Sequence, residues 1–316
     1  MIIVYTDAHQ QHQPPQEIYD GEYAPYAEVA ARADSIIARL RSDNLGEVIE
    51  PGSYPLDHTL KVHQKEYVEF IKNRAEKLPA NGVLYPSYFM TDTYAPITHG
   101  TFTAATKAVD AALTGADKVL AGEPTVYALC RPPGHHAEHN KLGGYCYFNN
   151  AAIAADYMTQ NGKKVAILDI DFHHGNGTQQ AFYERADVLY VSIHADPNHM
   201  YPYSTGFTHE TGAHEGQGYN KNYPLPLGTD DTAYQATLAT ALDDIKTFAP
   251  DYLIVSCGFD TYKDDPIGGF KLTVPGYAQM GSQIQTLGLP TLVVQEGGYC
   301  VEALGDMAAS FLSAFN

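Results

Sequence analysis

The chain has 316 residues, 44% of them hydrophobic, and is long enough to bury a large core. Its 37 acidic and 19 basic residues give a formal charge of −18, which disfavours nucleic acid and anionic membranes as partners and favours cationic ligands. The four cysteines lie far apart without a CxxC pair, so we expect free thiols rather than a disulfide framework or a cysteine zinc site.

Short apolar runs alternate along the chain with stretches whose apolar residues recur every three or four positions. In chain order, this pattern predicts a strand at 2–5, a helix at 27–41, a long loop at 78–100, a helix at 101–114, a strand at 125–129, a helix at 149–160, strands at 165–170 and 188–193, a helix at 232–248, strands at 253–255 and 291–294, and a helix at 301–315. Strands that alternate with helices indicate an α/β fold with a parallel sheet, here as a single domain over residues 1–316. Long irregular loops are often functional, so residues 78–100 are a candidate lid.

The N-terminal residues indicate where in the cell the protein is expected. The first ten residues, MIIVYTDAHQ, lack the basic start and the long apolar run of a signal peptide, and no stretch holds eighteen consecutive apolar residues. We therefore expect a cytoplasmic protein without a membrane partner.

Polar residues follow five of the six predicted strands. The segments that follow them are CRPPGHHAEH, DFHHGNG, HADP, SCGFD and QEGGY. In an open parallel sheet the carboxyl ends of the strands form the ligand crevice, so these segments are expected to meet at one edge.

The stretch ILDIDFHHGNGT, at residues 167–178, predicts a metal site. In an extended strand Asp169, Asp171 and His173 share one side. A catalytic zinc ion has three protein ligands and an open position, and Asp260 is the best third ligand beside Asp171 and His173. Two carboxylate ligands would also allow Fe2+ or Co2+. Asp169 would lie behind, free to bind a histidine or a monovalent cation.

Three further side chains could move a proton or stabilise charge. His135 and His136 follow two prolines, and a histidine near the metal could take a proton from water and hand it to a leaving amine. Asp169 and Asn176 are candidate partners that would orient these rings. The Tyr299 phenol could donate a hydrogen bond to an oxyanion.

Several segments together resemble one family. RPPGHHA, GGYCYFNNAA, ILDIDFHHGNGTQ, VSIHADP, CGFD followed by DDP, and EGGY occur in the order seen in the metal-dependent histone deacetylase superfamily. QEIYDGEY, GGYCYFNNAA and NYPLPLG are similar to its bacterial acetylpolyamine amidohydrolase branch. The resemblance implies the arginase-deacetylase fold, with eight mainly parallel strands flanked by helices. Asn176 departs from members that have aspartate there.

The resemblance also implies an activity, namely zinc-dependent hydrolysis of the acetyl amide of acetylputrescine, acetylcadaverine or acetylspermidine. It makes His136 the general base and acid, His135 a charged helper, and Tyr299 the group that polarises the carbonyl. The metal ligands it implies are Asp171, His173 and Asp260.

Further sites follow from the same resemblance. One structural K+ would be bound by Asp169, Asp171, His173, Ser192 and Ile193, and a second near Phe182, Arg185 and Val188. The substrate would lie in a narrow tunnel that involves Gly144, Tyr145, Tyr201 and Gly298. The loop at 78–100 would help to close the tunnel and to form a homodimer.

A small acetylated amine that carries a second, cationic amine needs a carboxylate at the tunnel mouth. Glu17, in PPQEIYDGEY, is the first candidate because the resemblance implies that this loop lies at the rim, and Asp92, in the expected lid, is the second. Aromatic walls can hold a cationic chain, and the acidic surface attracts one.

Three alternatives stay open. A binuclear manganese ureohydrolase of the same fold would need further acids two residues after His173 and Asp260, where the chain has Gly175 and Tyr262. A binding module could have kept the fold and lost catalysis. A protein lysine deacetylase, or one of broad specificity, would share every catalytic residue.

Overall fold

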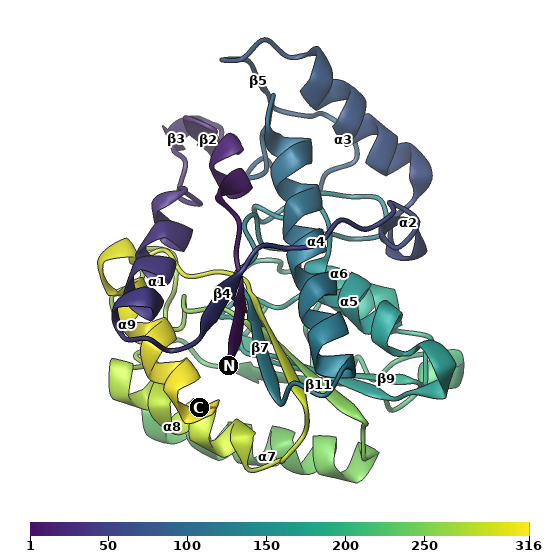
Figure 1. Cartoon of the computed structure of the whole chain (residues 1–316), viewed down its shortest axis with the longest axis vertical. Coiled ribbons are helices and arrows are strands. Elements are labelled where there is room, and N and C mark those ends of the chain that lie inside the picture. Colours follow the sequence, from purple (N-terminus) through teal and green to yellow (C-terminus); the bar gives the residue numbers. More distant parts are fainter. Residues whose placement is uncertain (316) are drawn as a thin grey trace.

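The computed structural model describes residues 1–315 and has an eight-stranded sheet at its centre (Figure 1). The strands stand in the order β10-β9-β8-β11-β12-β7-β1-β4, and each pair of neighbours runs parallel. They are β1 (Ile2–Val4), β4 (Glu47–Ile49), β7 (Thr125–Ala128), β8 (Val165–Asp169), β9 (Val188–Ala195), β10 (Asn220–Leu225), β11 (Tyr252–Cys257) and β12 (Thr291–Gln295). The α/β class and the eight-stranded parallel sheet predicted above are thus confirmed.

Helices cover both faces of this sheet. They are α1 (Ala31–Ser42), α2 (Thr59–Val62), α3 (Lys65–Lys77), α4 (Thr101–Leu120), α5 (Asn150–Met158), α6 (Asn176–Phe182), α7 (Asp231–Phe248), α8 (Val274–Gln285) and α9 (Val301–Leu312). Helices α1, α7, α8 and α9 pack on one face and α4 and α5 on the other (Figure 1). Successive strand residues serve the two faces in turn, so that Ile167 packs with α5 and Leu168 with the opposite layer. Central strands buried on both faces are apolar throughout, which is why their runs were recognisable.

Two short hairpins lie at the end of the molecule to which the central strands point. Strand β2 (Gln16–Tyr19) pairs antiparallel with β3 (Glu22–Pro25), and β5 (Val83–Leu84) pairs antiparallel with β6 (Ile97–Thr98). Both hairpins are at the top of Figure 1, and β1 runs towards them from the N-terminus. The second hairpin belongs to the loop predicted at 78–100, so this loop lies at the carboxyl end of the sheet.

The predicted strands and helices are present, but two helix ends were wrong by four residues or more. Helix α1 begins at Ala31 rather than at residue 27, only a few residues after strand β3 ends at Pro25. Helix α4 continues past residue 114 to Leu120, because Gly115 does not end it. A Cβ at Gly115 would lie 2.5 Å from Cδ1 of Leu292, so the glycine allows α4 to approach β12 closely.

The cysteines behave as predicted. All four are free thiols in the described chain, and Cys130, Cys146 and Cys257 are buried. Separately, no helix within residues 1–315 is both long and apolar enough to cross a membrane.

A buried ion-pair network ties the segment before α1 to the carboxyl end of the sheet. Glu28 Oε1 accepts hydrogen bonds from Arg32 (2.6 Å) and Arg131 (2.8 Å), and all three side chains are buried. Arg32 also donates to the backbone carbonyls of Gly298 (2.5 Å) and Glu296 (2.7 Å). The network therefore holds the loops that follow β7 and β12.

We expect Glu28→Gln to lower the free energy of unfolding by about 3–5 kcal/mol, because it leaves two buried guanidinium groups without a counter-charge. Urea denaturation measures this loss. As a control, Glu69→Gln removes one partner of the exposed Lys65–Glu69 pair and should change the free energy of unfolding little. Similar effects of the two substitutions would contradict the prediction.

Candidate active site

The loops after four adjacent strands form the site. Strands β8, β11, β12 and β7 are consecutive neighbours in the sheet, so their carboxyl ends lie side by side. The loops carry His135 and His136 after β7, Asp171 and His173 after β8, Asp260 after β11, and Tyr299 after β12. The strand order brings together residues that are far apart in the sequence.

Asp171, His173 and Asp260 form a compact group of metal-binding side chains. One ligand atom from each lies within 4.8 Å of the others. His173 Nδ1 is 2.9 Å from Asp260 Oδ2 and 3.5 Å from Asp171 Oδ1. Backbone N–H groups orient both carboxylates, since Asp171 Oδ2 accepts from Gly297 (2.8 Å) and Asp260 Oδ1 from Phe172 (2.9 Å). Two carboxylates and one imidazole fit Zn2+, Fe2+ or Co2+ with an open position.

The buried carboxylates give this group an excess of negative charge. Burial and the Asp171 carboxylate raise the pKa of Asp260 to about 7. Burial by itself lowers the pKa of His173, but the two aspartates outweigh it and raise that pKa to about 9. In the chain alone, protons on Asp260 and His173 therefore offset the negative charge of this group. A divalent cation bound there would displace these protons.

The two adjacent histidines have different partners. His135 Nδ1 lies 3.1 Å from Asp169 Oδ2, whereas His136 Nδ1 lies 2.8 Å from Asn176 Oδ1. Burial lowers the pKa of His135, but the carboxylates of Asp171 and Asp169 outweigh it and raise that pKa to about 10. Burial and the positive charges of His135 and His173 hold the pKa of His136 well below its usual value. At neutral pH, His135 is cationic and His136 is neutral.

Asn176 fixes the tautomer of His136. Its Nδ2 donates to Glu138 Oε1 (2.9 Å), so its Oδ1 faces the ring and accepts the hydrogen bond from His136 Nδ1. Nδ1 then carries the proton and Nε2 keeps a free lone pair. Glu138 was not among the predicted residues, although it is only two positions from His136 in HHAEH.

A cavity of about 400 Å³ opens onto these groups. Its walls include Tyr145 and Tyr201, as the resemblance implied, with Tyr299, His136 and His173 at the same cavity. The Tyr145 ring lies 5.4 Å from that of Tyr299, and the Tyr201 ring 4.8 Å from that of His136, centroid to centroid. The cavity wall is therefore largely aromatic.

Asp92 has a different place from that of Glu17. Its Oδ2 accepts hydrogen bonds from the Tyr201 hydroxyl (2.6 Å) and the Gly144 N–H (2.9 Å), and its Oδ1 accepts from the Tyr94 N–H (2.8 Å). The Asp92 carboxylate therefore holds the cavity wall from behind. Gly144 lines the cavity with φ +50°, and a Cβ there would overlap the His136 ring.

Glu17 lines the cavity and is only 5% exposed. Its Oε1 accepts a hydrogen bond from the Tyr145 hydroxyl (3.1 Å) and its Oε2 from the Ala27 N–H (3.2 Å). Burial raises the pKa of Glu17. Its partners in the chain are neutral, so a cationic ligand would supply the counter-charge that this carboxylate lacks.

The remaining predicted residues do not line the cavity and contact other parts of the chain. The Gly298 carbonyl accepts from Arg32, whose guanidinium carbon is 4.7 Å from the centroid of the Tyr299 ring. Ser192 Oγ is 2.7 Å from His194 Nδ1. The Arg185 guanidinium pairs with Asp156 and Asp187, and its carbon lies 5.1 Å from the centroid of the Phe182 ring, which is buried like Val188.

Further wall residues were missed from the sequence. They are Tyr19, Tyr94, Met200, Tyr203, Pro266, Ile267 and Gly268. Tyr19 lies in the same QEIYDGEY segment as Glu17, so its position could have been expected. The others come from irregular loops, where no periodic pattern indicates which side chains point inwards.

Known proteins resemble the chain over its whole length. The model of the histone deacetylase domain matches residues 26–315. Acetylpolyamine amidohydrolase 1 of Pseudomonas aeruginosa is 42% identical, with 100% of this chain and 99% of the relative covered. Acetylpolyamine amidohydrolase of Mycoplana ramosa is 38% identical, with 99% and 98% covered.

A solved structure extends the likeness to the fold. The crystal structure of acetylpolyamine aminohydrolase from Burkholderia pseudomallei matches with a TM-score of 0.95 at 37% identity, covering 100% of this chain and 98% of that chain. The match confirms the arginase-deacetylase fold that the resemblance implied. With a family model over residues 26–315 and relatives matched from end to end, the chain belongs to the histone deacetylase family and is a hydrolytic deacetylase.

Proposed function

We propose that the protein removes the acetyl group from N-acetylated polyamines, such as acetylputrescine, acetylcadaverine or acetylspermidine, and releases acetate and the free amine. The observation that carries this proposal is the buried Glu17 carboxylate in the same aromatic cavity as His136, His173 and Tyr299. The full-length likeness to proteins named acetylpolyamine amidohydrolases supports the same substrate class.

Asp171, His173 and Asp260 would hold the metal, with Zn2+ as the proposed ion and Fe2+ or Co2+ suited to the same donors. The bound ion would polarise the amide carbonyl and lower the pKa of the attacking water. Gly175 and Tyr262 offer no carboxylate for a second ion, so this donor set does not favour a binuclear ureohydrolase.

The chain's own groups would handle the protons and the developing charge. His136, neutral and with Nε2 free, takes the proton from the attacking water and passes it to the leaving amine. His135, kept cationic by Asp171 and Asp169, stabilises negative charge nearby. Burial raises the pKa of Tyr299 well above its usual value, so its phenol stays protonated and donates to the oxyanion.

The cavity suits a thin chain that ends in a cation. Tyr145 and Tyr201 offer aromatic faces to the methylene groups and to ammonium groups. Glu17 would bind the far amine with a charge-assisted hydrogen bond. The formal charge of −18 attracts such substrates over longer distances.

We also propose structural K+ at the two sets of residues that the family resemblance implies, Asp169, Asp171, His173, Ser192 and Ile193 in one and Phe182, Arg185 and Val188 in the other. The homodimer, the role of residues 78–100 as a lid, the cytoplasmic location and the lack of nucleic-acid and membrane partners stay predictions.

Asp171→Ala should abolish both metal binding and amide hydrolysis, because it removes one of three ligands and leaves an incomplete site. Metal analysis of the purified protein and an acetate-release assay measure the two effects. Asp243→Ala, which removes an exposed carboxylate, is the control and should change neither. A metal-free Asp171→Ala protein with full activity would refute the ligand assignment.

The adjacent histidines should differ in their effect on turnover. At saturating metal, His136→Ala should lower kcat by about 10²–10⁴-fold, the usual contribution of a general acid or base. His135→Ala should lower kcat less, because its ring supplies charge and no proton transfer. If the His136→Ala protein turned over faster than the His135→Ala protein, the two roles would have to be exchanged.

Glu17→Gln should lower kcat/KM for acetylputrescine by about ten- to a hundredfold, the value of a hydrogen bond to a charged group. Activity on a neutral N-alkylacetamide of similar length should change little, because it has no second amine. Glu22→Gln, on the exposed neighbouring strand, is the matched control. Parallel assays on acetyl-lysine peptides test the alternative, since equal efficiency on peptides and acetylpolyamines would indicate a broad or protein deacetylase.

A further inference from the structure

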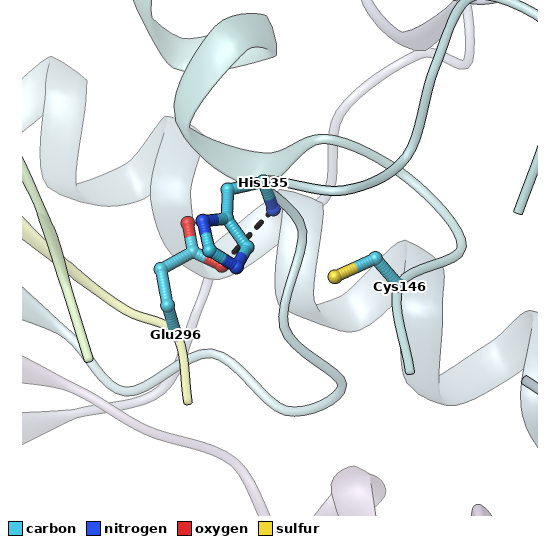
Figure 2. Close-up of side chains that lie close together, drawn as sticks. All are labelled: His135, Cys146 and Glu296. Atoms are coloured by element: carbon cyan, nitrogen blue, oxygen red, sulfur yellow. Dashed lines mark hydrogen bonds between the residues drawn. The ribbon is translucent and has the colours of Figure 1, made fainter. Parts of the chain in front are cut away.

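Glu296 is a buried carboxylate to which the mechanism above gives no role. It directly follows β12, has no exposed surface, and stands three residues before Tyr299. Its Oε2 accepts hydrogen bonds from the N–H groups of Gly134 (2.7 Å) and His135 (3.1 Å). Figure 2 shows the Glu296 carboxylate against the His135 backbone. The side chain thus joins the loop of Tyr299 to the loop of the two histidines.

The same place could be mistaken for a second metal site. Donor atoms of His135, Cys146 and Glu296 lie within 4.8 Å of one another (Figure 2). However, each residue already has partners in the chain: His135 Nδ1 has Asp169, Cys146 Sγ has the Gly144 carbonyl, and Glu296 has two backbone N–H groups. A role in holding the histidine loop keeps all of these contacts, whereas a second ion would compete for the Glu296 oxygen that the two N–H groups share.

Two prolines in the histidine loop make the hydrogen bonds to Glu296 important for the position of this loop. Pro132 and Pro133 have no N–H, so the first two N–H groups after Arg131 are those of Gly134 and His135. Both point to the same Glu296 oxygen. Without that oxygen two buried N–H groups would lack an acceptor, and the loop would have to shift to satisfy them.

We propose that Glu296 is a positioning residue that keeps His136 in place for proton transfer by fixing the backbone of Gly134 and His135. The proposal rests on the proposed function, in which His136 protonates the leaving amine. A displacement of about 1 Å in a reacting group can cost about a hundredfold in rate, so a small shift of this loop would be measurable.

Two substitutions of Glu296 distinguish the effect of side-chain length from the effect of charge. Glu296→Gln keeps the length, and its amide oxygen can still accept both N–H bonds while its NH2 group faces the Ser256 hydroxyl, the present partner of Oε1. Glu296→Asp keeps the charge but is one methylene too short to reach both N–H groups. Ser256→Ala, a control, removes the bond to Oε1 and leaves those to Oε2.

The proposal predicts an order of effects on kcat for an acetylated alkylamine. Glu296→Asp should lower kcat by about a hundredfold, Glu296→Gln by less than about tenfold, and Ser256→Ala least, with KM and bound metal unchanged in each. Circular dichroism checks the folding of every variant. If Glu296→Gln lost more activity than Glu296→Asp, charge rather than position would be decisive and the proposal would fail.

A comparison of leaving groups tests whether the loss passes through His136. 4-Nitroaniline, whose nitro group stabilises the departing nitrogen, needs less help from a general acid than an alkylamine. The loss in Glu296→Asp should therefore be smaller on 4-nitroacetanilide, where mainly the role of His136 as a base is affected, than on the alkyl amide, and equal losses would overturn the proposal. A parent protein inactive on both amides would instead refute the proposed function itself.

Discussion

Buried carboxylates at the carboxyl end of the sheet impose the charge balance on which the whole site depends. Asp169, Asp171, Asp260 and Glu296 are all almost completely buried. Each buried charge needs hydrogen-bond donors and an opposite charge, or it must take up a proton. Backbone N–H groups supply donors to all four of them, and the protonated His135 supplies one positive charge. The Asp171, His173 and Asp260 group is the natural place for a divalent cation to supply the rest.

The same balance gives two neighbouring histidines opposite properties. The two rings differ in the partner of Nδ1, which is a carboxylate for His135 and an amide for His136, and His135 Nε2 also lies 3.7 Å from Asp171 Oδ1. The carboxylates of Asp171 and Asp169 keep the His135 ring charged, and burial together with the charges of His135 and His173 keeps the His136 ring neutral. Titratable groups whose pKa values are pushed apart are typical of acid and base pairs. The amide of Asn176 orients the His136 ring without making it permanently cationic.

The sequence predicted most of the sheet because its central strands are buried on both faces. It missed β4 and β10, which are the two edge strands, since β4 has three residues and β10 carries Asn220, Lys221 and Asn222. Helix α8 was missed because Gly276 and Gly281 weaken its helical pattern. Helix α3, in contrast, has apolar residues at helical spacing and could have been predicted.

The residues of the candidate site likewise fall into those that the sequence could predict and those that it could not. Residues directly after the central strands could be found from the sequence, because parallel strands end at one edge. Glu138 and Tyr94 act through loops whose paths are set by hydrogen bonds between distant segments, and no local pattern reveals them. Glu296 directly follows β12 and could have been singled out, but its contact with the histidine loop depends on the fold. Asp92 was expected at the tunnel mouth beside Glu17, but its two oxygens already accept bonds from the wall.

The hydrogen bonds that Asp92 accepts from the cavity wall limit the size of the substrate that can enter. A carboxylate that holds Tyr201, Gly144 and Tyr94 together fixes the width of the cavity, and the Tyr145 hydroxyl is held in turn by Glu17. Walls fixed by buried hydrogen bonds do not widen without breaking them, and each broken bond leaves an unsatisfied buried group. A thin alkylamine enters such a cavity at little cost, whereas the backbone of a protein substrate must remain at the mouth. There it would meet the exposed rings of Tyr19 and Tyr203, and Glu17 would face no cation.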